Sequence, residues 1–237
     1  MLSHTAINDA LDALPTSLLS RSGSIFYTGR AAFKAPSQLY ILGLNPGGDP
    51  VAQAEDTIGT DRQRFLEGPA SWSAYADESW AGAAPGTLGI QPRVLHLLAA
   101  LGLNPRTVPA SNILFARSAT EAALAKEKID LLRACWPVQK AVIDTLGVQI
   151  VLCFGGTAGK WVRDALGAHA LIDTYVENNA RRWTSEAHRA LDGRVVVSLT
   201  HPGRANWCNP ASDPTALVAR VLAASGVAQR PRAARSG

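Results

Sequence analysis

Three short polar segments combine residue types that could hold a water molecule, read hydrogen bonds and stabilise negative charge. They are Gly43-Leu44-Asn45-Pro46-Gly47, Ser111-Asn112-Ile113-Leu114 and His201-Pro202-Gly203-Arg204. An asparagine amide both donates and accepts hydrogen bonds, but it is too weak a base to remove a proton. A histidine imidazole can donate to an oxygen on which charge develops. Each segment taken singly is also typical of a strand end or a turn, so the prediction of a site depends on their combination.

A fourth segment, from Gly155 to Lys160, resembles a phosphate-binding loop but departs from its pattern. The Walker pattern requires four residues between its first glycine and a Gly-Lys pair, and then Ser or Thr. Here Gly155 and Gly159 enclose three residues, and Trp161 follows Lys160. We therefore expect these glycines to let a helix begin close to the sheet, and nucleotide binding is the less favoured alternative.

The apolar pattern places the polar segments at or near strand ends. Strands are expected over residues 38–44, 111–115, 148–154 and 194–199, and helices over 7–19, 94–103, 129–146, 156–166 and 214–224. Prolines at 15 and 137 predict interruptions in two of these helices. Residues 51–89 have no regular pattern, and a long loop of this kind is often functional.

This alternation of strands and helices predicts one α/β domain over residues 1–227. Its core would be a central, mostly parallel four-stranded sheet flanked by helices. Ligands of such sheets bind beyond the carboxyl ends of the strands, where the polar segments are expected to converge. Residues 228–237 are basic and poor in apolar side chains, so we expect a disordered tail.

Composition and charge narrow the class of protein only slightly. Of 237 residues, 47% are hydrophobic and 18% charged, which is ordinary for a globular enzyme. The formal net charge of +4 is compatible with nucleic-acid binding but supports it weakly. The charge therefore favours a polyanionic partner without identifying one.

Neither a cofactor nor a membrane is indicated. The three cysteines form no CxxC pair, and no cluster of His, Cys and carboxylates has the spacing of a metal site. Cys153 lies in an apolar run and is expected to be buried and inert. No apolar run approaches the roughly 20 residues that span a bilayer, and no secretory signal is apparent. These observations predict a cytoplasmic protein that needs no metal and no cofactor.

In their order and spacing, the three segments resemble motifs of the uracil-DNA glycosylase superfamily, over roughly residues 38–209. The first is similar to the water-activating motif of the branches with Asn-Pro-Gly, which are the mismatch-specific and single-strand-selective branches. The second is similar to the strand whose Asn reads the base, and the third to the loop with the catalytic His and the DNA wedge. Residues 151–158 resemble the penultimate strand and its Gly turn. The resemblance implies the three-layer α/β fold of that superfamily.

The resemblance also implies an activity. The protein would be a monofunctional DNA glycosylase that flips uracil out of DNA and hydrolyses its N-glycosidic bond, leaving an abasic site in base excision repair. Asn45 would position the attacking water, His201 would donate to uracil O2, and Asn112 would read the base. The residues expected around the base are Gly43, Leu44, Gly47 and Phe65. The residues expected to contact DNA are Gly155, Gly156, Pro202, Gly203, Arg204 and Asn206. Arg204 would be either the wedge or a phosphate contact, and the protein would act as a monomer on single- or double-stranded DNA.

The chain departs from the family pattern at several positions. Gly203 stands where Ser is common, and Gly47 stands where the most uracil-strict branch has a Tyr that blocks the thymine methyl group. The small residue at 47 predicts tolerance of 5-substituted uracils. For the aromatic that stacks on the base, Phe65 is the first choice and Trp72 the second.

Three other functions stay open on the sequence alone. One is a glycosylase for other deaminated bases, such as hypoxanthine or xanthine. Another is a catalytically silent nucleic-acid-binding module of the same fold. The third is an enzyme that acts on free nucleosides or nucleotides, whose activity would not fall steeply with salt.

Overall fold

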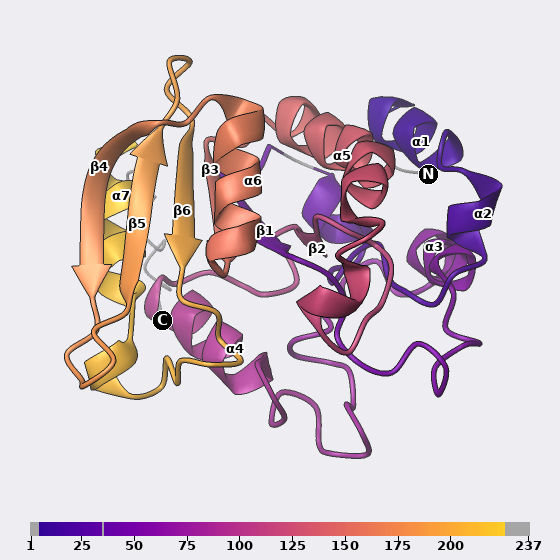
Figure 1. Ribbon diagram of the computed structural model, residues 1–237, viewed down its shortest axis with the longest axis horizontal. Helices are drawn as coiled ribbons and strands as arrows, with labels where there is room; N and C mark the ends of the chain where they lie inside the picture. Colours follow the sequence, from indigo (N-terminus) through magenta and orange to yellow (C-terminus); the bar gives the residue numbers. More distant parts are fainter. Residues whose placement is uncertain (1–4, 35, 226–237) are drawn as a thin grey trace, which may run out of the picture.

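A six-stranded mixed sheet forms the centre of the molecule (Figure 1). This is a computed structural model, and it describes residues 5–34 and 36–225. The strands are β1 (Leu39–Gly43), β2 (Ala110–Asn112), β3 (Ile150–Phe154), β4 (Ala170–Val176), β5 (Thr184–Arg189) and β6 (Val195–Leu199). Their spatial order is β2-β1-β3-β6-β5-β4. The strands β2, β1, β3 and β6 run parallel, and β5 and β4 continue the sheet antiparallel.

The expected parallel core is confirmed, but the expectation of four strands was wrong. The four strands predicted from apolar runs are the four parallel ones, and β1, β3 and β6 are buried at every position. The additional strands lie at the edge of the sheet. Most side chains of β4 are exposed, and β5 reads Thr-Ser-Glu-Ala-His-Arg. β5 has only one apolar residue, and the apolar residues of β4 are interrupted by Asp173 and Thr174, so neither strand forms the continuous apolar run that identified the others.

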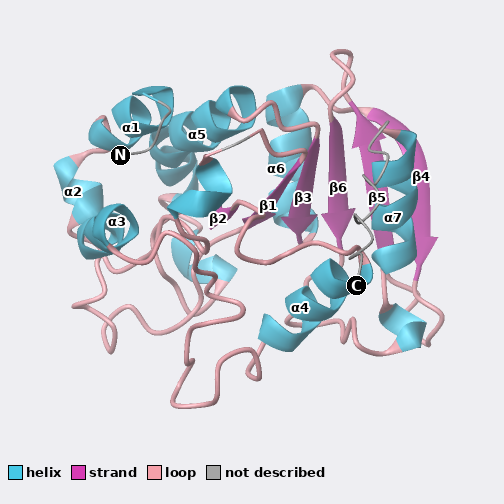
Figure 2. Cartoon of the chain, turned by 180° about the vertical axis from the view of Figure 1, so that it is seen from behind, coloured by secondary structure: helices cyan, strands magenta, loops and turns pink. Residues whose placement is uncertain are grey.

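Helices cover both faces of the sheet (Figures 1 and 2). They are α1 (Thr5–Asp12), α2 (Thr16–Leu19), α3 (Ile58–Glu67), α4 (Gln91–Ala100), α5 (Lys128–Thr145), α6 (Gly156–Leu166) and α7 (Thr215–Ala224). Alternate residues of β1 point into two separate cores. Tyr40 and Leu42 pack with residues of α1, α5 and α6, whereas Leu39 and Ile41 pack with residues of α4 and α7. The result is a three-layer α/β arrangement.

Most of the expected helices are present. The interruption near Pro15 separates α1 from α2. In contrast, α5 continues through Pro137 as one helix. The segment over 51–89, expected to be irregular, contains α3, whose first turn is capped by Thr57 through a 3.0 Å bond from the Thr60 amide.

Two further expectations concern the membrane and the tail. Within residues 5–34 and 36–225, no helix is long and apolar enough to cross a membrane. Residues 228–237 lie outside the described residues, so the expectation of a disordered tail stays a prediction.

The parallel strands bring the polar segments to one edge of the sheet. The carboxyl ends of β1, β2 and β6 are followed by loops at residues 44–48, 113–118 and 200–204, and β3 is joined to α6 through Gly155 alone. An extended segment before β1 borders β2 through antiparallel bridges, among them Phe26 with Ser111 and Gly23 with Ala116. This segment adds a wall that the apolar pattern did not predict.

Candidate functional site

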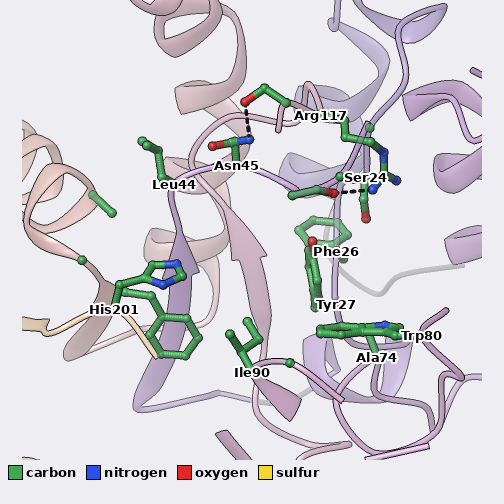
Figure 3. Close-up of a pocket in the computed structure, with 18 of the residues that line it drawn as sticks. Ser24, Phe26, Tyr27, Leu44, Asn45, Ala74, Trp80, Ile90, Arg117 and His201 are labelled. Carbon is green, nitrogen blue, oxygen red and sulfur yellow. Dashed lines mark hydrogen bonds between the residues drawn. The ribbon is translucent and has the colours of Figure 1, made fainter. Parts of the chain in front are cut away.

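A cleft of about 1650 Å³ opens at the carboxyl ends of the parallel strands. Eight of the predicted site residues line it: Leu44, Asn45, Gly47, Phe65, Gly155, Gly156, His201 and Arg204. Five others are not among the residues that line it: Gly43, Asn112, Pro202, Gly203 and Asn206. Figure 3 shows Asn45 and Leu44 at one end, with His201 and Ile90 facing Phe26, Tyr27 and Trp80 across the opening.

The Asn45 side chain is held by one half of its amide. Its Nδ2 donates to Ser118 Oγ at 3.0 Å and to the Pro46 carbonyl at 2.7 Å. The Ser118 hydroxyl in turn donates to the Thr120 carbonyl at 2.9 Å, so it is free to accept from Asn45. Asn45 Oδ1 accepts no hydrogen bond from any described residue. The fold thus leaves one acceptor on this wall of the cleft.

Backbone pairing fixes the loop that carries Asn45. The Leu114 amide donates to the Leu44 carbonyl at 2.9 Å, and the Ser118 amide donates to the Pro46 carbonyl at 3.1 Å. The Arg117 guanidinium donates to the Gly47 carbonyl at 2.7 Å. Two adjacent loops therefore hold each other, and Ser118 is a positioning residue that no sequence pattern indicated.

His201 is held in the same way, by one ring nitrogen. The Gly203 amide donates to His201 Nδ1 at 2.9 Å, which in the neutral ring places the hydrogen on Nε2. Nε2 makes no hydrogen bond to the described residues, so it is a free donor at the cleft. Burial, together with the charges of Arg204 and Arg93, lowers the pKa of His201 below its usual value near 6.5. The ring is therefore neutral at pH 7.

Two glycines shape the surroundings of this ring. A Cβ at Gly203 would lie 2.9 Å from His201 Nδ1, and a Cβ at Gly155 would lie 3.6 Å from its Cβ. Gly155 has a φ of +95° and precedes the first residue of α6, as expected of a glycine that lets a helix begin close to the sheet. Gly203 thus allows the backbone to approach the imidazole.

Asn112 lies behind the cleft wall, with 6% of its surface exposed. A Cβ at Gly43 would lie 2.0 Å from Asn112 Oδ1, so the glycine makes room for the amide. The Asn112 carbonyl accepts from Gln139 Nε2 at 2.7 Å. Gln139 is fully buried and also accepts from the Tyr40 hydroxyl. This buried network, which was not predicted, fixes the end of β2.

The structure distributes the aromatic side chains differently from the sequence expectation. Phe65 is only 8% exposed and packs against Phe26 and Phe33, at 4.7 and 5.4 Å between ring centroids. Phe65 therefore offers the cleft little of its ring. Trp72, the second choice, also lines the cleft. Tyr27 and Trp80, which precede the first motif or lie far beyond it, present more of their rings (Figure 3).

The remaining predicted contacts surround the His201 loop. Arg204 is exposed, and its carbonyl accepts from Arg181 Nη1 at 2.7 Å. Pro202 is buried, and its carbonyl accepts from Arg93. Asn206 caps a local turn through a 3.2 Å bond from the Cys208 amide, which is a structural role. Arg204 is thus the one member of this group whose charged side chain lines the cleft.

Both signs of charge line the cleft. Besides Arg204, it holds Arg64, Arg117 and Arg163 among basic residues and Asp61, Glu78, Glu121 and Glu186 among acidic ones. Asp61 accepts from the Ile25 amide at 2.7 Å, and burial raises the pKa of its carboxyl group. This carboxylate anchors the extended segment at residues 22–28.

The cysteines and carboxylates of the described chain do not assemble into a metal site. Cys153 is fully buried, as expected, and burial raises the pKa of its thiol. Cys135 is also buried, whereas Cys208 is exposed.

Comparison with models of known protein families gives no match, and comparison with curated protein sequences finds no similar protein.

Proposed function

We propose that the cleft hydrolyses the N-glycosidic bond of a uracil flipped out of DNA. One observation carries the proposal. Asn45 and His201 lie on the cleft wall, and each has one polar atom held by the fold and the other free. The free atoms are an acceptor, Asn45 Oδ1, and a donor, His201 Nε2. Hydrolysis of this bond needs both, because water must be oriented and the leaving base must be stabilised as an anion.

His201 would stabilise the leaving base. As the bond breaks, negative charge develops on the base, and the Nε2 hydrogen would be donated to its O2 oxygen. The lowered pKa supports this role, because a neutral ring with Nδ1 already occupied has its only hydrogen on Nε2. A fixed donor of this kind needs no reorganisation as the charge forms.

Asn45 would hold the attacking water. Its Oδ1 accepts one hydrogen of the water, and the amide cannot remove that proton as a carboxylate would. Its contribution is therefore orientation, which requires a rigid side chain. The bond to Ser118 and the paired backbone of the two loops support that rigidity.

Binding to DNA would depend on the basic residues at the mouth of the cleft. Arg204 is exposed beside His201 and is suited to a phosphate contact or to the gap left by the flipped base. A Cβ at Gly47 would meet no atom within 4 Å, so open space lies beside this residue. That space supports acceptance of uracils with a substituent at carbon 5.

The direct test is strand cleavage of a labelled oligonucleotide with a single uracil, treated with the protein and then with alkali. Single- and double-stranded substrates are compared, along with 5-hydroxymethyluracil, hypoxanthine and xanthine. The proposal predicts cleavage at uracil and at 5-hydroxymethyluracil. Cleavage only at hypoxanthine or xanthine would assign a different base. No cleavage at high enzyme excess would reject the proposal and leave a silent binding module or an enzyme that acts on free nucleosides or nucleotides.

A further inference from the structure

The Asn112 amide is buried next to the cleft without a partner for its nitrogen. Asn112 Nδ2 is inaccessible to solvent and makes no hydrogen bond to the described residues. The backbone of Asn112 is held by Gln139, and its Oδ1 lies against Gly43. A buried amide nitrogen left unpaired costs about 1–3 kcal/mol, so such a group usually has a functional partner.

Among the residues that line the cleft, Tyr27 is the one placed to be that partner. Phe26 pairs with Ser111 in an antiparallel bridge, so Tyr27 and Asn112 are diagonal neighbours on one face, a distance that an aromatic side chain can span. The Tyr27 amide donates to the Ala110 carbonyl, and its carbonyl accepts from the Ala74 amide, both at 2.8 Å. Its ring stacks on Tyr75, with centroids 5.6 Å apart. Backbone and ring are therefore both fixed.

The Tyr27 hydroxyl faces the cleft on the wall opposite His201 (Figure 3). Burial raises the pKa of Tyr27 to about 12, and the neighbouring Asn112 amide partly opposes this rise. The phenol is therefore protonated at neutral pH. A protonated phenol has one hydrogen to donate, and its oxygen can accept a hydrogen bond.

We propose that Tyr27 and Asn112 form one recognition pair for the ring carbonyl that stands where cytosine or adenine has its amino group. In the proposed complex the Asn112 amide turns so that Nδ2 donates to the Tyr27 oxygen, a bond that the present structure does not form, and the Tyr27 hydroxyl donates to the carbonyl. This inference rests on the proposed function, since it assigns the group that identifies the base in the same cleft. It adds an aromatic residue that lies before the first motif in the chain.

The pair presents a donor and no acceptor to the base. Because Asn112 occupies the acceptor position of the phenol, only the phenol hydrogen remains for the ligand. A ring oxo group accepts that hydrogen, whereas the amino group of cytosine or adenine would leave two donors facing each other. The pair therefore selects bases in which deamination has replaced an amino group by an oxo group. Sites that leave buried polar groups unpaired with the wrong ligand discriminate strongly.

The test compares Tyr27→Phe with Tyr75→Phe. Both substitutions remove one hydroxyl from the same aromatic stack, but Tyr75 does not line the cleft. Excision of uracil is measured under single-turnover conditions, and binding of free uracil and free cytosine is measured by NMR titration of the labelled protein. Thermal unfolding verifies that both variants fold.

The pair predicts a loss of about 10- to 100-fold in uracil excision and a matching loss in uracil binding for Tyr27→Phe alone. A double-mutant cycle with Asn112→Ala should be non-additive, since either change breaks the same relay. If the wild type excises uracil and Tyr27→Phe excises it at the same rate, the pair is overturned and the proposed function stands. Absence of wild-type excision would overturn the proposed function, and the uracil titration would then decide the pair: no uracil binding, or binding insensitive to Tyr27→Phe, rejects it.

Discussion

Asn45 and His201 each owe their orientation to a neighbour rather than to their own position in the chain. Ser118 accepts from the Asn45 amide, and the Gly203 amide occupies one nitrogen of His201. The sequence alone indicated Asn45 and His201 and their order in the chain. It did not indicate that Ser118 contacts Asn45, because the two lie 73 positions apart and the parallel pairing of β1 and β2 brings them together.

Removal of the Ser118 hydroxyl should weaken catalysis without removing a predicted catalytic group. In Ser118→Ala the Asn45 amide loses its acceptor and can turn, so its Oδ1 no longer orients the water. We expect single-turnover excision to fall by about 10-fold, and by about 100-fold or more in Asn45→Ala. An excision rate in Ser118→Ala equal to that of the wild type would show that this bond does not position Asn45.

Excision should depend on the protonation of His201. Its pKa in the folded protein lies below 6.5, so the neutral form predominates at pH 7. Protonation would place a hydrogen on Nδ1 against the Gly203 amide hydrogen and displace the ring, so the rate should fall as the pH drops through that lower value. The lowered pKa of His201 also means that the folded protein loses stability as the pH falls, because the unfolded chain binds this proton more readily. The measurement is single-turnover rate against pH for the wild type and for His96→Gln.

His96 pairs with Asp213 at 2.9 Å and does not line the cleft, so its variant should keep the wild-type profile. His201→Gln should lose the acidic limb together with most of the rate. If His201→Gln kept an unchanged acidic limb, another group would be responsible for it.

At the level of elements, the parallel core could be predicted because its strands are buried throughout. β1, β3 and β6 are mostly apolar, and the turns that follow them are rich in Gly, Pro and Asn. The strands β4 and β5 could not be predicted, because Asp173 and Thr174 interrupt the apolar residues of β4 and β5 has only one apolar residue. The wall at residues 22–28 was hidden for another reason: it is held by isolated bridges and not by a regular strand.

Phe65 and Trp72, the aromatic residues predicted to stack on the base, both line the cleft, but the sequence did not indicate Tyr27. The resemblance places the stacking aromatic close to the first motif, and both predicted residues follow that motif in the chain. The structure packs Phe65 against Phe26 and Phe33, and the ring of Tyr27 reaches the cleft from a segment before β1. Distance along the chain carries no information on contacts that form across a sheet.

The close approach of β1 and β2 gives a prediction on Gly43. In Gly43→Ala the new Cβ would lie 2.0 Å from Asn112 Oδ1, so the amide must move away from its present position. Uracil excision should fall by about 10-fold or more, because the Asn112 amide of the proposed recognition pair is displaced. Excision by Gly43→Ala at the wild-type rate would contradict the assignment.

The packing of α6 on β6 gives a prediction on stability. A Cβ at Gly159 would lie 1.9 Å from Ser198 Oγ and 2.5 Å from Ser198 Cβ, so helix and strand must separate. Gly159→Ala should lower the free energy of unfolding by about 1–3 kcal/mol, measured by urea denaturation. Gly156→Ala adds a Cβ in open space on the same helix and should cause no comparable loss. A Gly159→Ala variant with the same free energy of unfolding as the wild type would show that α6 and β6 are not in close contact at this position.

For the whole molecule, DNA binding should depend on salt through the basic residues at the cleft. Each phosphate contact contributes about one unit to the slope of log affinity against log salt concentration. Arg204→Ala should reduce that slope by about 1, as measured by fluorescence anisotropy with labelled DNA. Arg133→Ala is the control, because Arg133 is 76% exposed on α5, away from the cleft. Identical slopes for the two variants would remove Arg204 from the DNA contacts.

The central claim is that Asn45 and His201 together break a glycosidic bond in this cleft. The most direct measurement is single-turnover excision of uracil by the wild type, Asn45→Ala, His201→Ala and the double variant, with DNA binding measured in parallel. We predict that each single substitution lowers the rate by about 100- to 1,000-fold while DNA affinity stays within a few fold. A wild type that removes no uracil, or variants that remove it as fast as the wild type, would contradict the claim.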